Sequence, residues 1–148
     1  MDLLTGVFTN TMDDKGRISI PSRIRDRLTE NILILTKGIE QCVWLLPPDQ
    51  WERVSMAFLS TTSLSLKKSN LIHHRFIVPA QEIEIDRVGR IAIPQSLREF
   101  AGLSKECVVL GKGKSIEIWD AERYQSFLEV NDDLLQEVLE ETVPFSLF

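Results

Sequence analysis

The amino-acid sequence predicts an α+β fold built from two similar halves that share one core. Three observations lead to this prediction. Residues 13–21, with the sequence DDKGRISIP, are matched 73 residues later by DRVGRIAIP. Apolar and polar residues alternate before and within both segments, which is typical of a half-buried strand. Farther along each half, apolar residues recur at helical spacing. A match of this length indicates a duplicated structural unit of about 50 residues.

Each half is predicted to begin with two short strands joined by a tight turn. The side chains expected on one face of the first strand are Phe8, Asn10 and Met12 in the first half and Ile83 and Ile85 in the second. Gly16 and Gly89 stand where a tight turn needs a positive φ, which glycine adopts without steric cost. Arg17 and Arg90 then lie on the polar side of the second strand.

The rest of each half is predicted to form a short helix, a hairpin and a longer helix. Pro21 and Pro94 can end a strand and open helices at about residues 22–28 and 95–101. The hairpins are predicted from paired apolar runs at residues 32–35 with 42–46, and at 107–110 with 116–119. Amphipathic helices are expected after each hairpin, in the connector before Pro79 and in the C-terminal tail.

These predictions divide the chain into four segments. They are a first repeat at residues 1–60, a helical connector at 61–80, a second repeat at 81–128 and an acidic tail at 129–148. Because neither repeat is long enough to close a core alone, we expect their strands to interlock.

The composition is that of an ordinary globular protein, with 148 residues of which 43% are apolar and 26% charged. No run approaches the roughly 18 apolar residues of a transmembrane helix, so no membrane partner is expected. The first residues lack the basic and apolar regions of a secretory signal. The two cysteines, Cys42 and Cys107, do not require a disulfide scaffold, and a cytosolic protein with free thiols is expected.

The charge of the chain is unevenly distributed. The net charge is −5, but residues 129–148 contain six acids and no base, so residues 1–128 carry +1. Five basic residues lie close together, opposed only by Asp26: Lys15, Arg17, Arg23, Arg25 and Arg27. A local basic stripe of this kind favours phosphate binding even where the net charge is negative.

The paired motifs resemble those of a known family. The pattern from Gly6 through Phe8, Asn10 and Met12 into residues 13–21 is similar to the N-terminal signature of the MraZ family, and residues 86–94 resemble its second copy. The resemblance implies two tandem AbrB-like repeats that form a pseudo-twofold swapped-hairpin β-barrel with flanking helices.

The same resemblance implies a function. Members of this family regulate transcription of the bacterial division and cell-wall gene cluster, and they bind direct repeats in the promoter of their own operon as ring-shaped homo-oligomers. By this resemblance, the chain is expected to bind double-stranded DNA in the cytoplasm, at the nucleoid, and to use no cofactor and no small-molecule substrate.

The residues expected at the DNA face are the basic ones of the two turns and the first helix: Lys15, Arg17, Arg23, Arg87 and Arg90. A guanidinium can bind phosphate or the edge of guanine through two hydrogen bonds. The residues expected to build the turns are Asp13, Gly16, Asp86 and Gly89. An ion pair between each aspartate and its arginine could hold the turn, a role compatible with DNA contact. Arg23 could also be simply solvated. Since Val88 replaces Lys15 in the second turn, the two turns are expected to contribute unequally.

Other kinds of site are not expected. The Gly-Lys-Ser at residues 113–115 lacks the glycine that a phosphate loop needs five residues earlier, where Val108 stands. The cysteines and histidines, Cys42, Cys107, His73 and His74, lack the spacing of zinc ligands, so no metal site is expected. No combination of acid, base and nucleophile indicates an enzyme.

Two rival functions share the same fold. One is an oligomeric scaffold that binds a protein partner through the charged turns. The other is an antitoxin-like autoregulator whose acidic tail binds a partner. The tail carries an apolar stripe at Leu134, Leu135, Val138 and Leu139. It is expected either to pack on the barrel or on a neighbouring subunit, or to compete with DNA for the arginines.

Overall fold

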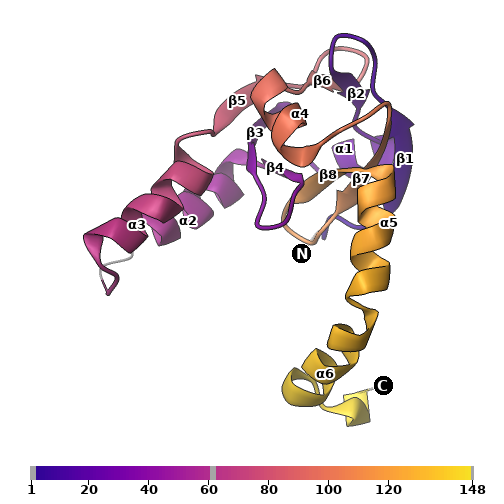
Figure 1. The fold of residues 1–148 in the computed structure, drawn as a ribbon. Coiled ribbons are helices and arrows are strands. Elements are labelled where there is room, and N and C mark those ends of the chain that lie inside the picture. Colours follow the sequence, from indigo (N-terminus) through magenta and orange to yellow (C-terminus); the bar gives the residue numbers. More distant parts are fainter. Residues whose placement is uncertain (1–2, 61–62, 148) are drawn as a thin grey trace.

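A computed structural model describes residues 3–60 and 63–147 of the chain (Figure 1). The predicted segments that include residues 1–2, 61–62 and 148 extend there outside the described residues. The strands of the described chain are β1 (Val7–Thr11), β2 (Arg17–Ser19), β3 (Ile32–Lys37), β4 (Val43–Leu46), β5 (Gln81–Glu84), β6 (Arg90–Ala92), β7 (Glu106–Gly111) and β8 (Ile116–Asp120). The α-helices are α1 (Ser22–Arg25), α2 (Pro48–Leu59), α3 (Leu66–Ile72), α4 (Gln95–Ala101), α5 (Ala121–Val130) and α6 (Asp132–Thr142). A π-helical turn follows α3 at His73–Ile77, and a 3₁₀ turn ends the chain at Phe145–Leu147.

The strand pairings cross between the two halves. Six strands form one antiparallel sheet in the order β1-β7-β8-β4-β3-β5, and β2 pairs with β6 in a separate two-stranded ribbon. Thus β1 of the first half pairs with β7 of the second, and β5 of the second half pairs with β3 of the first. The α+β class and the interlocking of strands are as the sequence predicts.

The core draws its side chains from both halves. Matched positions of the repeat are equally buried, with Ile18 and Ile91 each 1% exposed. Around them lie the buried aliphatic residues of the hairpins and short helices: Leu33, Leu35, Leu45, Leu97, Val109, Ile116 and Ile118. Because the turns of both halves lie over one tightly packed core, the two turns have little freedom to move relative to each other.

The two turn glycines confirm the predicted turn geometry. Gly16 has a φ of 76° and Gly89 a φ of 84°, a conformation that favours glycine. The prolines also act as predicted, because Pro21 and Pro94 stand immediately before α1 and α4. Gly102 ends α4 in the left-handed conformation, with a φ of 61°.

The helix predicted at residues 22–28 is shorter than expected, because α1 ends at Arg25. The N–H of Arg27 bonds to the carbonyl of Ile24, and that of Leu28 to the carbonyl of Arg25. These three-residue steps tighten the chain into turns that lead toward β3. Arg23 therefore lies within α1, whereas Arg27 lies beyond its end.

Two helical arms extend from the sheets in different directions. In Figure 1, α2 and α3 lie side by side in one arm, while α5 and α6 lead away in the other. The aromatic rings at the base of the first arm stack, with the ring centroids of Trp44 and Phe76 5.3 Å apart and those of Phe58 and Phe76 4.6 Å apart. None of the helices in the described part of the chain is both long and apolar enough to cross a membrane.

The tail helix forms as predicted, but its apolar stripe does not pack on the sheet of its own chain. Leu134 is 53% exposed, Leu135 49% and Val138 43%. Packing on its own barrel, one of the expected roles of the tail, is therefore wrong for this stripe, because α6 points away from the sheet (Figure 1).

Candidate nucleic-acid interface

The first turn is held by a single carboxylate. Oδ1 of Asp13 accepts hydrogen bonds from the backbone N–H groups of Lys15 at 2.9 Å and Arg17 at 2.8 Å. Oδ2 accepts a third from Nε of Arg17 at 2.7 Å. The N–H of Gly16 closes the turn on the carbonyl of Asp13 at 3.0 Å. The aspartate thus fixes both the backbone of the turn and the direction of the arginine.

The second turn repeats this arrangement. Oδ1 of Asp86 accepts from the N–H groups of Val88 and Arg90, each at 2.9 Å, and Oδ2 accepts from Nε of Arg90 at 3.2 Å. Gly89 closes the turn on the carbonyl of Asp86 at 3.0 Å. The predicted ion pairs therefore exist in both halves, with the longer contact in the second.

Hydrogen bonding keeps both carboxylates charged. The N–H of Arg17 lowers the pKa of Asp13 below its ordinary value, and the N–H of Arg90 does the same for Asp86. Each ion pair uses Nε of the arginine. Within residues 3–60 and 63–147, Nη1 and Nη2 of Arg17 and Arg90 make no hydrogen bond. Both arginine side chains are 36% exposed, so these donors are available to an acceptor.

The pairing of β2 with β6 brings the two arginines onto one face of the ribbon. Arg17 lies opposite Ala92 and Arg90 lies opposite Ser19, so the two arginines occupy diagonal ends of the ribbon. Since the intervening isoleucines face the core, alternation directs both arginines to the outer face.

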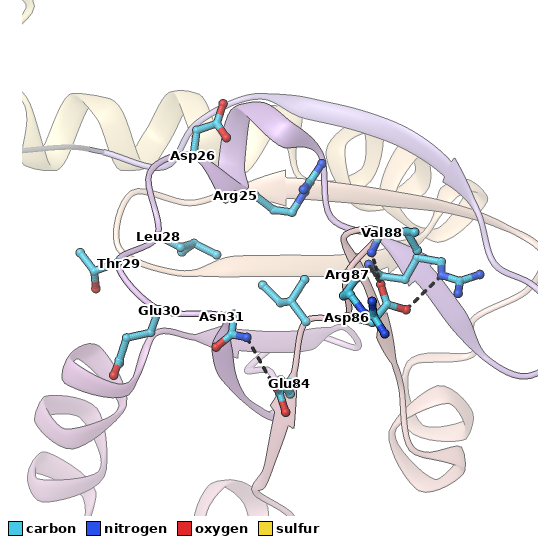
Figure 2. A pocket seen from close by; sticks show the side chains of 12 residues that line it. Arg25, Asp26, Leu28, Thr29, Glu30, Asn31, Glu84, Asp86, Arg87 and Val88 are labelled. Carbon is cyan, nitrogen blue, oxygen red and sulfur yellow. Dashed lines mark hydrogen bonds and ion pairs between the residues drawn. The ribbon is translucent and has the colours of Figure 1, made fainter.

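Two further arginines, which sequence analysis did not assign, support the turns crosswise. A Cβ placed on Gly16 would lie 2.7 Å from Cζ of Arg98, and one on Gly89 would lie 2.6 Å from Cζ of Arg25. Arg25 belongs to the first half and Arg98 to the second, so each guanidinium covers the turn of the other half. Figure 2 shows Arg25 beside the second turn.

The backbone shows the same crosswise relation. The N–H of Ile20 bonds to the carbonyl of Gly89 at 2.8 Å, and the N–H of Ile93 bonds to the carbonyl of Gly16 at 2.9 Å. The repeat itself carried a signal for the arginines, because Arg25 and Arg98 are 73 residues apart. A long-range contact between halves leaves no local pattern, so their role was not predictable.

An open groove of about 900 Å³ runs beside the second turn (Figure 2). Its charged lining residues are Arg25, Arg87, Arg90, Asp26, Glu30, Glu84 and Asp86. Three positive and four negative side chains line the groove, so it carries no excess of positive charge.

The other predicted DNA-facing residues are solvent-exposed. Lys15 lies at the tip of the first turn and Arg87 at the tip of the second, where the neighbouring Val88 is 65% exposed. Arg23 is exposed on α1. The basic side chains of the turns therefore gather around the ribbon, with Arg23 on the adjacent helix.

The cysteines lie in the core, away from the turns. Cys42 and Cys107 are fully buried, and burial raises the pKa of both thiols, that of Cys107 to about 11. Across residues 3–60 and 63–147, no three histidine, cysteine, aspartate or glutamate side chains gather in a cluster that could hold a metal ion.

The fold and the paired turns define a tandem α+β protein that presents matched arginines from a two-stranded ribbon. The model of the MraZ protein family, described as antitoxin-like, matches residues 3–74 and again residues 76–145. The chain belongs to the MraZ family.

Curated relatives support the same assignment. The chain is 44% identical over 137 residues to a protein of Treponema denticola, covering 93% of this chain and 95% of the relative. It is 44% identical over 124 residues to one of Treponema pallidum (strain Nichols), covering 84% and 83%, and 39% identical over 142 residues to one of Frankia alni, covering 96% and 98%. All three are named "Transcriptional regulator MraZ", so the chain falls in a family of transcriptional regulators.

One solved structure also resembles the chain: the solution structure of PHS018 from Pyrococcus horikoshii. It is 19% identical, and the match covers 80% of this chain and 89% of that one with a TM-score of 0.32. Such a score is too low to define a common fold.

Proposed function

We propose that the chain is a DNA-binding transcriptional regulator that reads promoter DNA with the β2–β6 ribbon. The observation that carries the proposal is the pair of partly exposed guanidinium groups on one face of the β2–β6 ribbon. The major groove of DNA admits a two-stranded β-ribbon, and an arginine there can donate two hydrogen bonds to O6 and N7 of guanine. The proposed contacts to DNA bases are those of Arg17 and Arg90.

The turn aspartates prepare the arginines for this contact. Asp13 and Asp86 occupy Nε, which leaves the terminal amino groups in a fixed plane for an acceptor. A fixed guanidinium loses less conformational freedom on binding than a mobile one. Lys15, Arg87 and Arg23 would contact phosphates, which position the protein without specifying sequence.

Binding by one copy should be weak, because few basic residues face one site and the net charge of the chain is −5. We therefore propose a homo-oligomer, in the form of a ring, that binds direct repeats in the promoter of its own operon in the division and cell-wall cluster. Several copies on several repeats would supply the affinity by multivalency. Such a regulator would act in the cytoplasm, at the nucleoid.

The same proposal includes the organisation inferred from the repeat. Residues 1–60 and 81–128 would be AbrB-like repeats of a swapped-hairpin barrel, with residues 61–80 as connector and 129–148 as tail. The crossed strand pairings and the crosswise arginines support it.

A DNA-binding assay with Arg17→Ala tests the proposal. A bidentate base contact is worth about 1–3 kcal/mol per site, so the variant should bind a promoter repeat roughly 5- to 150-fold more weakly. Its melting temperature should fall by no more than about 4 °C, because exposed ion pairs add little to stability. Lys114→Ala, which removes one exposed positive charge outside the turns and the helical arms, is the control for a purely electrostatic loss.

The opposite result would support the turn-holding role alone. If Arg17→Ala bound DNA as tightly as the parent protein and melted far lower, the arginine would be structural. Failure of the parent protein to protect any repeat upstream of its own gene would favour a scaffold or an antitoxin-like partner. The antitoxin-like description of the family and the acidic tail are the observations that favour that second candidate.

A further inference from the structure

Most of the large apolar side chains that the fold leaves exposed lie on the two helical arms. In the first arm they are Met56, Leu59, Leu64, Leu66 and Leu71, and in the second they are Leu128, Val130, Leu134, Leu135 and Val138. Exposed apolar patches of this kind commonly mark contacts with another molecule. The arms are therefore candidate surfaces for contact with another molecule.

The two arms carry opposite charges. In the basic arm, α3 carries Lys67 and Lys68 and no acid. The other helix of that arm, α2, has Arg53 beside two acids, Asp49 and Glu52. The acidic arm, residues 128–142, has six acids and no base: Glu129, Asp132, Asp133, Glu137, Glu140 and Glu141. The end helix of each arm, α3 in one and α6 in the other, thus offers exposed apolar side chains with charges of one sign beside them.

We propose that the acidic arm of one copy binds the basic arm of the next copy, helix α6 against helix α3. Leu134, Leu135 and Val138 would cover Leu66 and Leu71 of the neighbouring copy. The exposed pair of Glu137 and Glu141, one turn apart beside the apolar stripe, would meet Lys67 and Lys68. This inference rests on the proposed homo-oligomer and names its interface.

Within a single copy, the apolar side chains of α3 and α6 stay uncovered. Figure 1 shows these two helices at the ends of arms that lead away from the sheet in different directions. Because the two contacting surfaces differ, the contact is head-to-tail, and repeating it produces a closed ring or an open filament. Complementary charge fixes the order of the copies, since two acidic arms or two basic arms repel each other.

Charge reversal tests the interface by light scattering of the full chain. Lys67→Glu with Lys68→Glu should reduce the particle mass toward the 17.0 kDa of one chain, and Glu137→Lys with Glu141→Lys should do the same. Combining all four changes in one chain restores opposite charges and should restore the parent mass. Lys105→Glu with Lys114→Glu, which reverses two exposed lysines outside the arms, is the matched control and should leave the mass unchanged.

Each other outcome overturns the inference. If the acidic-arm variant loses mass but the fourfold variant does not regain it, the acidic arm binds a surface other than α3. If both arm variants keep the parent mass, the arms are not the interface. Circular dichroism of each variant shows whether it is folded, and the fourfold variant serves as an internal check because it carries every substitution.

DNA binding is measured separately, on one promoter repeat and on several. If the arms assemble the protein but it does not read DNA, the masses change as expected and neither DNA is bound. If it reads DNA but assembles by another surface, binding persists and the masses do not respond to charge reversal. The two proposals therefore fail independently.

Discussion

Replacing Gly16 by alanine should damage the first turn more than the same change does elsewhere in the chain. Gly16 has a φ of 76°, and Gly113 has a φ of 87° in a turn where a Cβ would meet nothing within 4 Å. A side chain in this conformation costs about 1–2 kcal/mol. In a chain of this size that lowers the melting temperature by roughly 2–8 °C. Gly113→Ala should show this cost alone.

At Gly16 the new methyl group would also displace Arg98, because Cζ lies 2.7 Å and Cδ 3.0 Å from the Cβ position. We therefore expect Gly16→Ala to melt below Gly113→Ala and to weaken binding of a promoter repeat, while Gly113→Ala binds as the parent does. Calorimetry and fluorescence anisotropy measure the two effects.

A double substitution identifies the cause. Once Arg98→Ala has removed the guanidinium, adding Gly16→Ala should cost only what Gly113→Ala costs. Equal melting temperatures for the two single glycine variants, with equal DNA affinities, would refute the view that Arg98 supports the first turn.

Three more outcomes follow from the site. Arg17→Ala should weaken DNA binding more than Arg90→Ala, because the first turn adds a lysine and has the shorter ion pair; equal losses in a binding titration would contradict this. The pKa of Asp13 is lower in the folded protein, so the stabilisation by its carboxylate is complete at neutral pH and is lost as the pH falls below 3.8. In melting curves, Asp13→Asn should therefore lose less stability in acid than the parent protein does. Cys42 and Cys107 should resist alkylation at pH 8 in the native protein and react once it is unfolded; rapid native labelling would contradict their burial.

Local features of this protein were predictable from sequence because local residues determine them. Gly16 and Gly89 require particular backbone angles, and Pro21 and Pro94 set the starts of helices, so the turns and short helices were found at the right places. The end of α1 was not, since the turns toward β3 depend on the packing of the whole chain rather than on a stop signal.

The candidate site was predictable only in part. The ion pairs were predicted, because aspartate and arginine lie four residues apart in both turns. The crosswise support by Arg25 and Arg98 was not, because it depends on the pairing of distant strands. Likewise, the apolar stripe on α6 was evident from the sequence. Only the structure shows that the rest of the same chain leaves this stripe exposed.

The crosswise hydrogen bonds of Ile20 to Gly89 and Ile93 to Gly16 make this chain the equivalent of a dimer fused into one polypeptide. Two identical subunits related by a twofold axis must present identical reading surfaces, and they match palindromic DNA. Fusion removes that restriction, because each half can accumulate its own substitutions. The lysine at position 15 and the valine at position 88 are such a difference. Under the proposed function, such a fused protein would distinguish the two directions along a duplex. Direct repeats would then give every copy of the proposed oligomer the same polarity.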